Sequence, residues 1–548
     1  MPTVTLNRKT FEKLVGKKLN DATLKDRISY LGTDLENVTA DKIIVEIFPN
    51  RPDMLSEQGF ARAFASFIGA KKGFREYSVK KSGQKVIVEQ SAKNVRPYTA
   101  CAIVKGIKFD DEKIREVIQI QEKLHVTYGR NRKKAAVGIY PFERITPPIR
   151  FLAMKPSEII FRPLEYPTEI NAMQMLSKHP AGREYGHLLN GMEKFPVFLD
   201  STGKVLSVPP IINSHDIGKI TEATTDVFIE CSGFDYSVQA TCLNIIVTAL
   251  SDMGGTVYSV EIDMYGKNIT SPDLSPSFMC LDLAYINKRL GLSLKESEAK
   301  ELLSRMGHGY SNGKITIPPY RADILHQADI ATDIAIAYGY ENFPEKISKI
   351  HSIAGEDKFE VFKRRAAEIL ASIGMIECKT YHLSSKDSQS KLMDCDISPL
   401  PLANSLNEEY SVLLAWALPS LMDVLKKNKH NEYPQNIFSI NTVFKKGNSE
   451  TGVIENDRLA CILCNEISDY TRIRQIFDYL LRMLGIEYTV NQTNHSSFIP
   501  GRVARISVKG KDVAYVGEIS PQVISNWELS MPVAAFELNL TELFDVLN

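Results

Sequence analysis

The sequence has no excess of either charge, because Lys and Arg together number 66 and so do Asp and Glu. A balanced chain has no overall field that draws it to nucleic acid or membrane, so any RNA binding must come from local patches. It also has no apolar run long enough to span a bilayer, and its first residues lack the apolar core of a signal peptide. We therefore expect a cytoplasmic protein with no membrane partner.

Cysteine is scarce, with eight residues among 548 and no spacing typical of secreted proteins. This usage favours a reducing compartment. Cys461 and Cys464 have CxxC spacing, but they lie in an apolar run and no second pair follows. In a strand their side chains would point to opposite faces, so we predict two core residues rather than a metal or redox site.

Several catalytic signatures are missing as well. The sequence contains no GxxxxGK[ST] phosphate loop, no HExxH and no GxSxG. With 44% hydrophobic and 24% charged residues, it has ample material for several cores. The residues alone indicate a multidomain protein with one rigid polar pocket and one acidic cluster.

The length and the element pattern predict an α+β multidomain fold. Residues 1–85 form a small α/β domain, and 86–267 a domain of mixed strands and helices. Residues 268–345 read as a helical domain. Residues 346–548 begin with an amphipathic helix and continue with strand-like runs, which suggests a broad, mostly antiparallel sheet. The basic segment 71–85 reads as a solvated linker, with an RNA contact as the alternative.

Capping signals predict three helices within these domains. Ser56 opens one that ends at Gly69, and Asp235 opens a longer one that stops before the next glycine pair. Ser293 and Glu296 have the register of a capping box for a third helix.

The polar pocket is indicated by "SVPPIINS" (207–214). Pro209 and Pro210 remove backbone donors, so the segment cannot be a central strand, yet its neighbours are too apolar for a free loop. We predict a stiff, buried edge that fixes the directions of Ser207, Asn213 and Ser214.

A second strand carries polar groups on one face. The segment "TDVFIECSG" alternates strictly. Its two faces are predicted to hold Val227, Ile229 and Cys231 on one side, and Phe228, Glu230 and Ser232 on the other.

The acidic cluster comprises Asp323, Asp329 and Asp333. Two of these carboxylates are four residues apart and would repel on one helix face. Arg321, the helix N-terminus, a partner's basic group or a metal could relieve this repulsion. Carboxylate oxygens suit Mg²⁺, and ordinary acidity at a helix start is the alternative.

The segment "GRNRKKAAVGIY" places Arg130, Arg132, Lys133 and Lys134 directly before a strand-like run. The cluster could be a solvated turn or a loop that contacts phosphates of RNA. His125, just upstream, is interpreted as a structural residue, with a proton carrier as the alternative.

Taken together, the sequence resembles the beta subunits of phenylalanyl-tRNA synthetases of the archaeal and eukaryotic cytosolic type. The resemblance covers essentially the whole chain in order. Its most specific stretches are "EIFPNRPDMLS", "GRNRKKAAVGIY", "VLSVPPIINSHDIGKIT", "PPYRADILHQADIATDIAIAYGYENFP" and "PGRVARISVKGKDVAYVGEISPQV".

The resemblance implies an α2β2 enzyme that joins phenylalanine to tRNA(Phe) with ATP and Mg²⁺. Activation and transfer would take place in the alpha subunit, so this chain has no catalytic residue for aminoacylation. Its last domain would be a class II synthetase core that has lost its active site. Consistent with this, Leu414 stands where relatives often carry Arg, and Ser439 and Asn441 stand where relatives tend to have Glu and Gly.

The same resemblance assigns the two candidate sites. Residues 86–267 would be an editing domain that hydrolyses tyrosyl-tRNA, with a pocket formed by Ser207, Asn213, Glu230 and Ser232. A site for Mg²⁺ shared with the alpha subunit would match Asp323, Asp329 and Asp333, although Thr332 replaces a family Glu.

Three interpretations follow. The chain is a synthetase subunit with active editing, a subunit for assembly and tRNA binding whose editing has decayed, or a stand-alone deacylase. "YPFERI" (140–145) also departs from the family pattern beside the pocket.

Overall fold

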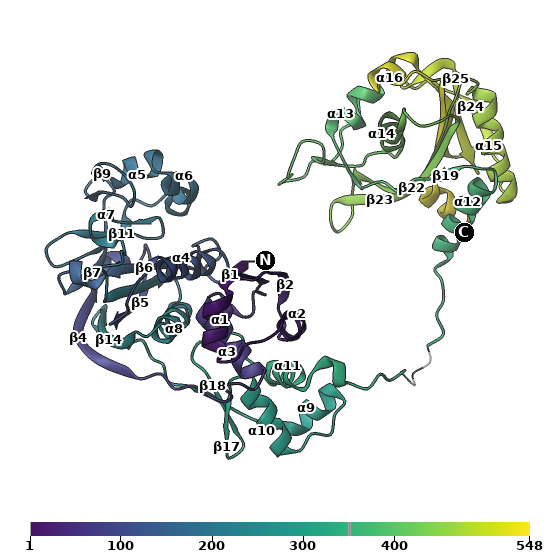
Figure 1. The fold of residues 1–548 in the computed structure, drawn as a ribbon. Helices are drawn as coiled ribbons and strands as arrows, with labels where there is room; N and C mark the ends of the chain where they lie inside the picture. Colours follow the sequence, from purple (N-terminus) through teal and green to yellow (C-terminus); the bar gives the residue numbers. More distant parts are fainter. Residues whose placement is uncertain (1, 349, 351) are drawn as a thin grey trace. The chain divides into compact units, whose positions relative to one another are not determined.

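The chain divides into two compact units, residues 1–346 and 347–548. The computed structural model describes residues 2–348, 350 and 352–548, and Figure 1 shows their ribbon. Each unit has cores of its own, and each is described by itself below.

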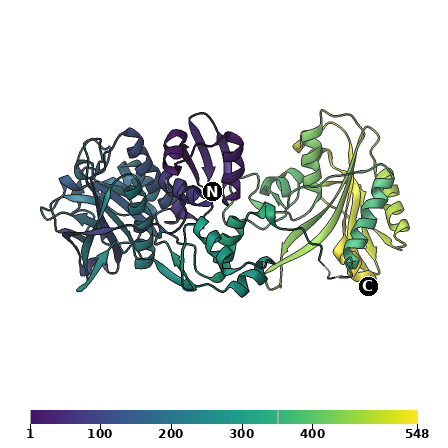
Figure 2. The ribbon, with the colours of Figure 1, turned by 60° about the horizontal axis from the view of Figure 1, so that its bottom comes forward.

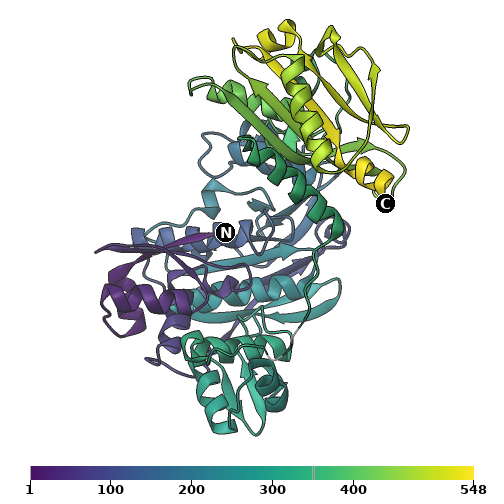
Figure 3. The ribbon, with the colours of Figure 1, turned by 90° about the vertical axis from the view of Figure 1, so that its right-hand side faces the viewer.

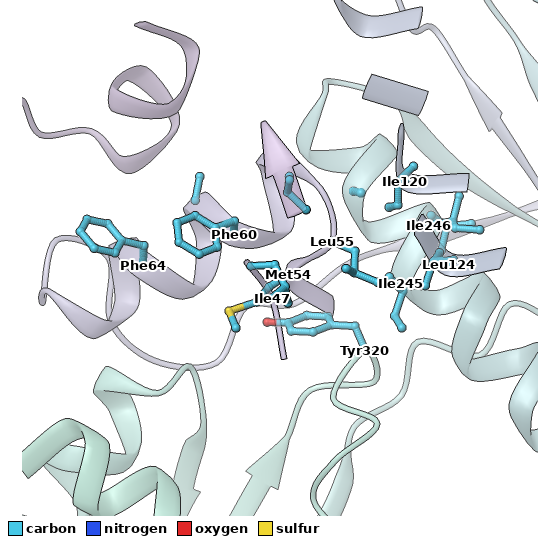
Figure 4. Close-up of a cluster of buried hydrophobic side chains, with 14 of the residues drawn as sticks. Ile47, Met54, Leu55, Phe60, Phe64, Ile120, Leu124, Ile245, Ile246 and Tyr320 are labelled. Carbon is cyan, nitrogen blue, oxygen red and sulfur yellow. The ribbon is translucent and has the colours of Figure 1, made fainter. Parts of the chain in front are cut away.

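The first unit starts with a three-stranded antiparallel sheet of order β1-β3-β2. Its elements are β1 (Thr3–Asn7), α1 (Arg8–Val15), α2 (Asp21–Tyr30), β2 (Asp34–Val38), β3 (Lys42–Glu46) and α3 (Glu57–Phe67). The Ser56 hydroxyl accepts a 3.0 Å hydrogen bond from the N–H of Gly59, so the predicted helix start is confirmed. Phe60 and Phe64 of α3 belong to a core that continues into Ile245 and Ile246 of α8 (Figure 4).

A ten-stranded sheet follows, with the order β12-β11-β10-β7-β4-β14-β5-β13-β6 and with β15 paired to β14. The strands are β4 (Val79–Val88), β5 (Tyr98–Lys105), β6 (Ala135–Pro141), β7 (Ile149–Met154), β10 (Phe195–Leu199), β11 (Val205–Val208), β12 (Ile212–Asn213), β13 (Val227–Gly233), β14 (Thr256–Met264) and β15 (Lys267–Ser271). Beside them lie α4 (Asp111–Val126), β8 (Ile160–Phe161), β9 (Ile170–Asn171), α5 (Ala172–Lys178), α6 (Pro180–Tyr185), α7 (His215–Gly218) and α8 (Tyr236–Asp252).

Strand β13 lies inside this sheet, antiparallel to both β5 and β6. The alternation predicted for it is confirmed, because Val227, Ile229 and Cys231 share a core with α8 while Phe228 belongs to a different core. The start of α8 is confirmed too, since Asp235 Oδ1 accepts a 2.9 Å hydrogen bond from the N–H of Ser237.

The predicted linker at 71–85 is wrong in its second half. Strand β4 begins at Val79 and pairs in parallel with β14 in two stretches, separated by an irregularity in register between Ser259 and Glu261. The backbone of this segment is therefore held in the ladder while its lysine side chains stay at the surface. Charge alone concealed the strand because a ladder uses backbone groups and leaves room for polar side chains on an open face.

The rest of the first unit contains β16 (Ser277–Cys280), α9 (Leu283–Leu290), α10 (Glu296–Arg305), β17 (Gly309–Ser311), β18 (Lys314–Ile317) and α11 (Gln327–Tyr338). Three of these form a small sheet of order β16-β18-β17, which the helical prediction did not include. Helix α3 contacts both α8 and α10, and Figure 2 shows the ribbon of the first unit from another side.

The capping box predicted at Ser293 and Glu296 is also wrong. Helix α10 begins at Glu296, and Glu298 accepts a 2.7 Å hydrogen bond from the N–H of Lys295. The Asn287 side chain binds both the N–H and the carbonyl of Leu294 at 2.8 and 3.0 Å. These bonds hold Leu294 outside the helix, so the cap falls two residues later than the sequence pattern suggests.

The second unit is built on a seven-stranded sheet of order β19-β22-β23-β27-β26-β25-β24, antiparallel except for the β19–β22 pair. This confirms the predicted antiparallel sheet. Its elements are α12 (Lys358–Ser372), β19 (Ile376–Glu377), β20 (Leu383–Ser384), α13 (Lys386–Gln389), β21 (Val412–Leu413), α14 (Leu418–Asn428), β22 (Gln435–Lys446), β23 (Val453–Cys464), α15 (Tyr470–Met483), β24 (Thr489–Gln492), β25 (Phe498–Val508), β26 (Lys511–Ile519), α16 (Pro521–Asn526), β27 (Val533–Asn539) and α17 (Leu540–Leu547).

Helices cover both faces of this sheet (Figure 3), with α12, α15 and α17 on one face and α14 and α16 on the other. Cys461 lies in the core under α12, α15 and α17, and Cys464 lies in the core under α14 and α16, as predicted for a buried strand whose side chains alternate between faces. All eight cysteines are free. Within the described residues no helix is long and apolar enough to cross a membrane.

Candidate functional site

The "SVPPIINS" stretch forms one wall of a cavity at an edge of the ten-stranded sheet. Strands β11 and β12 pair antiparallel, and the two prolines lie in the turn between them. Ser207 and Asn213 face each other in this pairing, and Ser207 and Ser214 are buried. The predicted stiff edge is confirmed.

The cavity has a volume of about 180 Å³ and brings together three of the four predicted pocket residues, Ser207, Asn213 and Glu230. Ser232 lies outside the lining, because Arg96 Nε donates a 3.1 Å hydrogen bond to its hydroxyl. The Asn213 amide makes no hydrogen bond within the described residues. It is therefore free to bind a ligand.

Glu230 is the electrostatic centre of this site. Burial raises the pKa of its carboxyl to about 7, while the hydrogen bond from Tyr140 and the nearby charge of Arg96 limit the rise. Burial likewise lowers the pKa of Arg96 to about 10. Oε2 of Glu230 is buried and has no hydrogen-bond partner among the described residues. Such an oxygen is costly to leave unpaired, so it marks a place for a donor.

Tyr140 and Gly138 lie outside the cavity lining but contact its polar residues, and neither was predicted from the sequence. The Tyr140 hydroxyl lies 2.8 Å from Ser207 Oγ and 3.0 Å from Glu230 Oε1. Gly138 faces Glu230 across the β6–β13 pair, and a Cβ there would lie 1.9 Å from the Tyr140 hydroxyl and 2.6 Å from Glu230 Oε1. Only a glycine leaves space for this contact. Tyr140 is the first residue of "YPFERI", but its partners come from distant strands, so no local pattern indicates its contacts.

The four basic residues before β6 do not act as one patch. Arg130 and Arg132 adopt positive φ angles of 49° and 66°, which fold the segment into a turn. Arg132 points inward, where it donates hydrogen bonds to the carbonyls of Pro210 and Ile211 at 3.2 and 2.8 Å and lines the cavity. The Lys134 ammonium lies 5.5 Å from the centre of the Tyr128 ring, while Arg130 and Lys133 are exposed. Of the four, these last two have side chains open to solvent.

His125 supports the structural interpretation. Its Nε2 accepts a 2.8 Å hydrogen bond from the N–H of Val137, and its Nδ1 lies 3.3 Å from Glu122 Oε1. Burial lowers the pKa of the ring, so the neutral form is favoured.

The acidic cluster is organised around a buried arginine. Arg321 binds Asp323 through two 2.8 Å hydrogen bonds and donates a third, also 2.8 Å, to Asp333. Asp333 Oδ2 also lies 2.7 Å from Nε2 of His308, and the nearby Arg321 charge holds the pKa of Asp333 below its usual value despite burial. Of the alternatives above, Arg321 therefore compensates the charge of Asp333, and the helix N-terminus compensates that of Asp329.

Asp329 serves the helix rather than the cluster. Its Oδ2 accepts 2.8 Å hydrogen bonds from the N–H groups of Leu325 and His326, which caps α11. The Thr332 hydroxyl donates to the carbonyl of Ala328 one turn back. Within the described part of the chain, these three aspartates do not bring their oxygens close enough together to hold a common metal ion, so the arrangement does not fit Mg²⁺.

The second unit carries no charged group at three positions singled out above. Leu414 is fully buried in the core against α14. The buried Asn441 amide donates to the hydroxyls of Thr380 and Ser439 at 2.8 and 2.9 Å. Apolar packing and internal hydrogen bonds thus fill these positions.

Comparisons with known proteins match this architecture. Residues 343–540 match the family model described as the phenylalanyl tRNA synthetase beta chain CLM domain, and residues 279–340 match the tRNA synthetase B5 domain. The chain is 38% identical over 555 residues to the phenylalanine–tRNA ligase beta subunit of Pyrococcus abyssi, covering 99% of this chain and 100% of the relative. The corresponding protein of Archaeoglobus fulgidus is 36% identical over 100% of this chain and 99% of its own length.

A solved structure agrees with these matches. It is an N-terminal fragment of the phenylalanyl-tRNA synthetase beta subunit of Pyrococcus horikoshii, 37% identical, with a TM-score of 0.59 over 62% of this chain and 99% of the fragment. Full-length similarity at this level, together with two matching domain models in the expected order, shows that this chain belongs to the phenylalanine–tRNA ligase beta subunit family.

Proposed function

We propose that this chain is the beta subunit of a cytoplasmic α2β2 enzyme whose alpha subunit joins phenylalanine to tRNA(Phe) with ATP. The relatives carry the name of this ligase subunit. In the second unit, the buried and uncharged positions of Leu414 and Asn441 are consistent with chemistry in the partner. The exposed Arg130 and Lys133 are the candidate tRNA contacts that remain open to solvent. Mg²⁺ would then be held outside the Arg321 cluster.

The cavity at Glu230 is proposed to hydrolyse tyrosyl-tRNA. The observation that carries this proposal is the buried, unpartnered Oε2 of Glu230 in the cavity wall. The hydroxyl of a tyrosyl group would donate to this oxygen, whereas phenylalanine offers no donor and would leave it unpaired. A site built to bind the tyrosine hydroxyl rejects phenylalanine strongly, whereas an apolar pocket built for phenylalanine rejects tyrosine only weakly.

Hydrolysis would use a positioned water rather than a side-chain nucleophile. The hydroxyl of Ser207 is already bonded to Tyr140, and His125 accepts from a backbone N–H. Asn213 is the lining residue with a free amide, so it is proposed to orient the ester or the water.

A deacylation assay on tyrosyl-tRNA with the co-expressed subunits tests this function. Asn213→Ala should slow tyrosine release by roughly tenfold or more, the effect of losing one well-placed hydrogen bond, while phenylalanylation stays unchanged. Asn94→Ala is the matched control, because Asn94 is exposed in a turn of the same unit. Equal release by wild type and Asn213→Ala would exclude this role of Asn213.

A subunit for assembly and tRNA binding, without editing, is the second candidate. It is favoured by the Tyr140 hydroxyl, which already bonds Ser207 and Glu230. A complex that phenylalanylates tRNA but leaves tyrosyl-tRNA intact would establish this alternative.

A further inference from the structure

A second, larger cavity lies in the first unit, with a volume of about 670 Å³. It is formed where α1 and α3 meet the stretch 71–76 and the segment 306–321. It shares no lining residue with the Glu230 cavity. Its size is within the usual range for a small-molecule site, and Lys and Arg outnumber Asp and Glu in its lining by seven to three.

Two of the buried arginines in this cavity are already paired with carboxylates. Arg51 binds Asp53 through two 2.9 Å hydrogen bonds, and Arg321 binds the acidic cluster described above.

Arg62 differs from them. It donates hydrogen bonds to the Tyr77 hydroxyl at 2.7 Å and to Asp252 Oδ2 at 2.8 Å, and its guanidinium lies 3.8 Å from the centre of the Tyr320 ring. Its Nε and second terminal nitrogen find no hydrogen-bond acceptor within the described residues. Gln58, also in the lining, has a buried Oε1 with no donor. The inner cavity thus offers two unpaired donors and one unpaired acceptor.

The mouth of the cavity carries more positive than negative charge, although Lys72 is paired with Glu301 and the exposed Glu76 also lines it. Lys71 donates to the carbonyl of Leu14 at 2.7 Å, an acceptor that leaves its charge uncompensated. Arg75 shares the single carboxylate of Asp252 with Arg62. Lys13 is exposed and has no ion-pair partner within the described part of the chain. An anionic group at the mouth would balance these charges.

We propose that this cavity binds a small phosphate ester that carries hydroxyl groups, of the sugar phosphate class. The phosphate is bound at the mouth by Lys13, Lys71 and Arg75, because ammonium and guanidinium groups form charge-assisted bonds with its oxygens. A hydroxyl reaches Gln58, since its Oε1 requires a donor that a phosphate dianion lacks, and the ester or ring oxygens accept from Arg62.

The geometry favours such a ligand over a nucleic acid strand. Sequence-tolerant binding of single strands relies on accessible aromatic rings on which bases stack. Two aromatic rings line this cavity: Tyr320 is only 5% exposed with its face covered by Arg62, and Phe74 is half-buried. Figure 4 shows Tyr320 directed into the same core as Met54 and Phe60.

Calorimetric titration of the full-length chain tests the proposal, with ribose 5-phosphate, glucose 6-phosphate and glycerol 3-phosphate as probes. Inorganic phosphate and glucose serve as the two halves of the ligand. The double variant Lys13→Gln/Lys71→Gln removes the charge at the mouth. Lys288→Gln/Lys300→Gln is the matched control, because both lysines are exposed and lie outside the cavity.

We expect at least one sugar phosphate to bind, with its Kd raised roughly tenfold in the mouth variant and unchanged in the control. Arg62→Lys, which keeps the charge but loses two donors, should weaken the same ligand while leaving binding of inorganic phosphate unchanged. The proposal is overturned if none of the three esters binds, if inorganic phosphate binds as tightly as they do, or if both double variants weaken binding equally. A loss of tRNA affinity in the mouth variant, without loss of sugar phosphate binding, would assign the mouth to RNA instead.

Discussion

The Glu230 cavity and the Arg321 cluster are two buried polar sites of the same unit, and they differ in how their carboxylates are satisfied. In the cluster, the half-buried Asp323 and the buried Asp333 each have a partner on Arg321, and Asp333 also contacts His308. In the cavity, Glu230 keeps one oxygen without any partner among the described residues. The two sites also have opposite pKa shifts, since the pKa of Glu230 is raised and that of Asp333 is lowered.

This difference separates a structural site from a candidate binding site. A closed network of charges stabilises its neighbours and leaves nothing for a ligand to bind. An unpaired buried oxygen destabilises the free protein. A ligand that supplies a hydrogen-bond donor removes this cost, which makes the free energy of binding more favourable. In the sequence, both sites are simply clusters of polar residues. The hydrogen bonds and ion pairs of the folded chain distinguish them.

Removing the centre of the closed cluster should have the largest effect. Arg321→Ala would leave Asp333 buried without its cation and the half-buried Asp323 without a partner, and we expect the free energy of unfolding to fall by about 3–5 kcal/mol. Denaturant unfolding of the full chain, followed by a probe in the first unit, measures this loss.

The matched control is Arg289→Ala, an exposed arginine on α9. It should change stability by about 0.5 kcal/mol or less. If Mg²⁺ restored the stability of the Arg321 variant, the cluster would be a metal site rather than a closed network of ion pairs.

The pH dependence of the open site gives the next largest effect. Glu230 has a folded pKa of about 7, above its usual 4.5, so its contribution to stability is present below pH 4.5 and is lost as the pH rises towards 7. The side chain of Glu230→Gln stays neutral at every pH. The difference in unfolding free energy between this variant and wild type should therefore be about 2–3 kcal/mol more favourable to the variant at pH 8 than at pH 4. Unfolding free energies of both proteins at the two pH values test this.

A variant in the closed cluster should behave in the opposite way. Asp333 has a lowered pKa, so its contribution is present above its unfolded pKa and is lost as the pH falls through the folded one. Asp333→Asn should therefore be destabilising at pH 7, and the penalty should shrink in acid. Equal pH profiles for the Glu230 and Asp333 variants would contradict the comparison.

The smallest effect is expected at Asp329, which caps α11. Asp329→Asn keeps one acceptor oxygen but removes the negative charge at the helix start, so stability should fall by about 0.5–1 kcal/mol. Thermal unfolding with and without Mg²⁺ measures it, and a loss as large as that of Arg321→Ala, or one seen only with Mg²⁺, would give Asp329 a different role.

Local patterns predicted much of the fold. The strict alternation at 227–232 and the side-chain caps at Ser56 and Asp235 depend on neighbours within a few residues, and the structure confirms all three. The capping box predicted at Ser293 is wrong because Asn287, a residue of the preceding helix, binds both backbone groups of Leu294 and holds it outside helix α10. The strand at 79–88 was missed because its partner β14 lies far along the chain.

The residues of the candidate site were predicted only in part, because some of their contacts join segments that are distant in the sequence. Ser207, Asn213 and Glu230 line one cavity, as predicted. Ser232 instead accepts a hydrogen bond from Arg96, and Tyr140, which was not predicted, bonds Glu230. Each of these two contacts links segments more than 80 residues apart. A single sequence does not encode them in any local pattern.

The class of fold, the faces of its strands, the proline-containing edge and the family could be predicted from residue patterns, because these follow from periodicity, steric limits on the backbone and long ordered motifs. Which polar groups are satisfied depends on contacts that form only on folding. In the folded chain Arg321 pairs with two aspartates, Arg132 lines the Glu230 cavity, and one oxygen of Glu230 has no donor among the described residues. Hydrogen bonds and ion pairs act over a few ångströms in space, and the chain must fold before those distances exist.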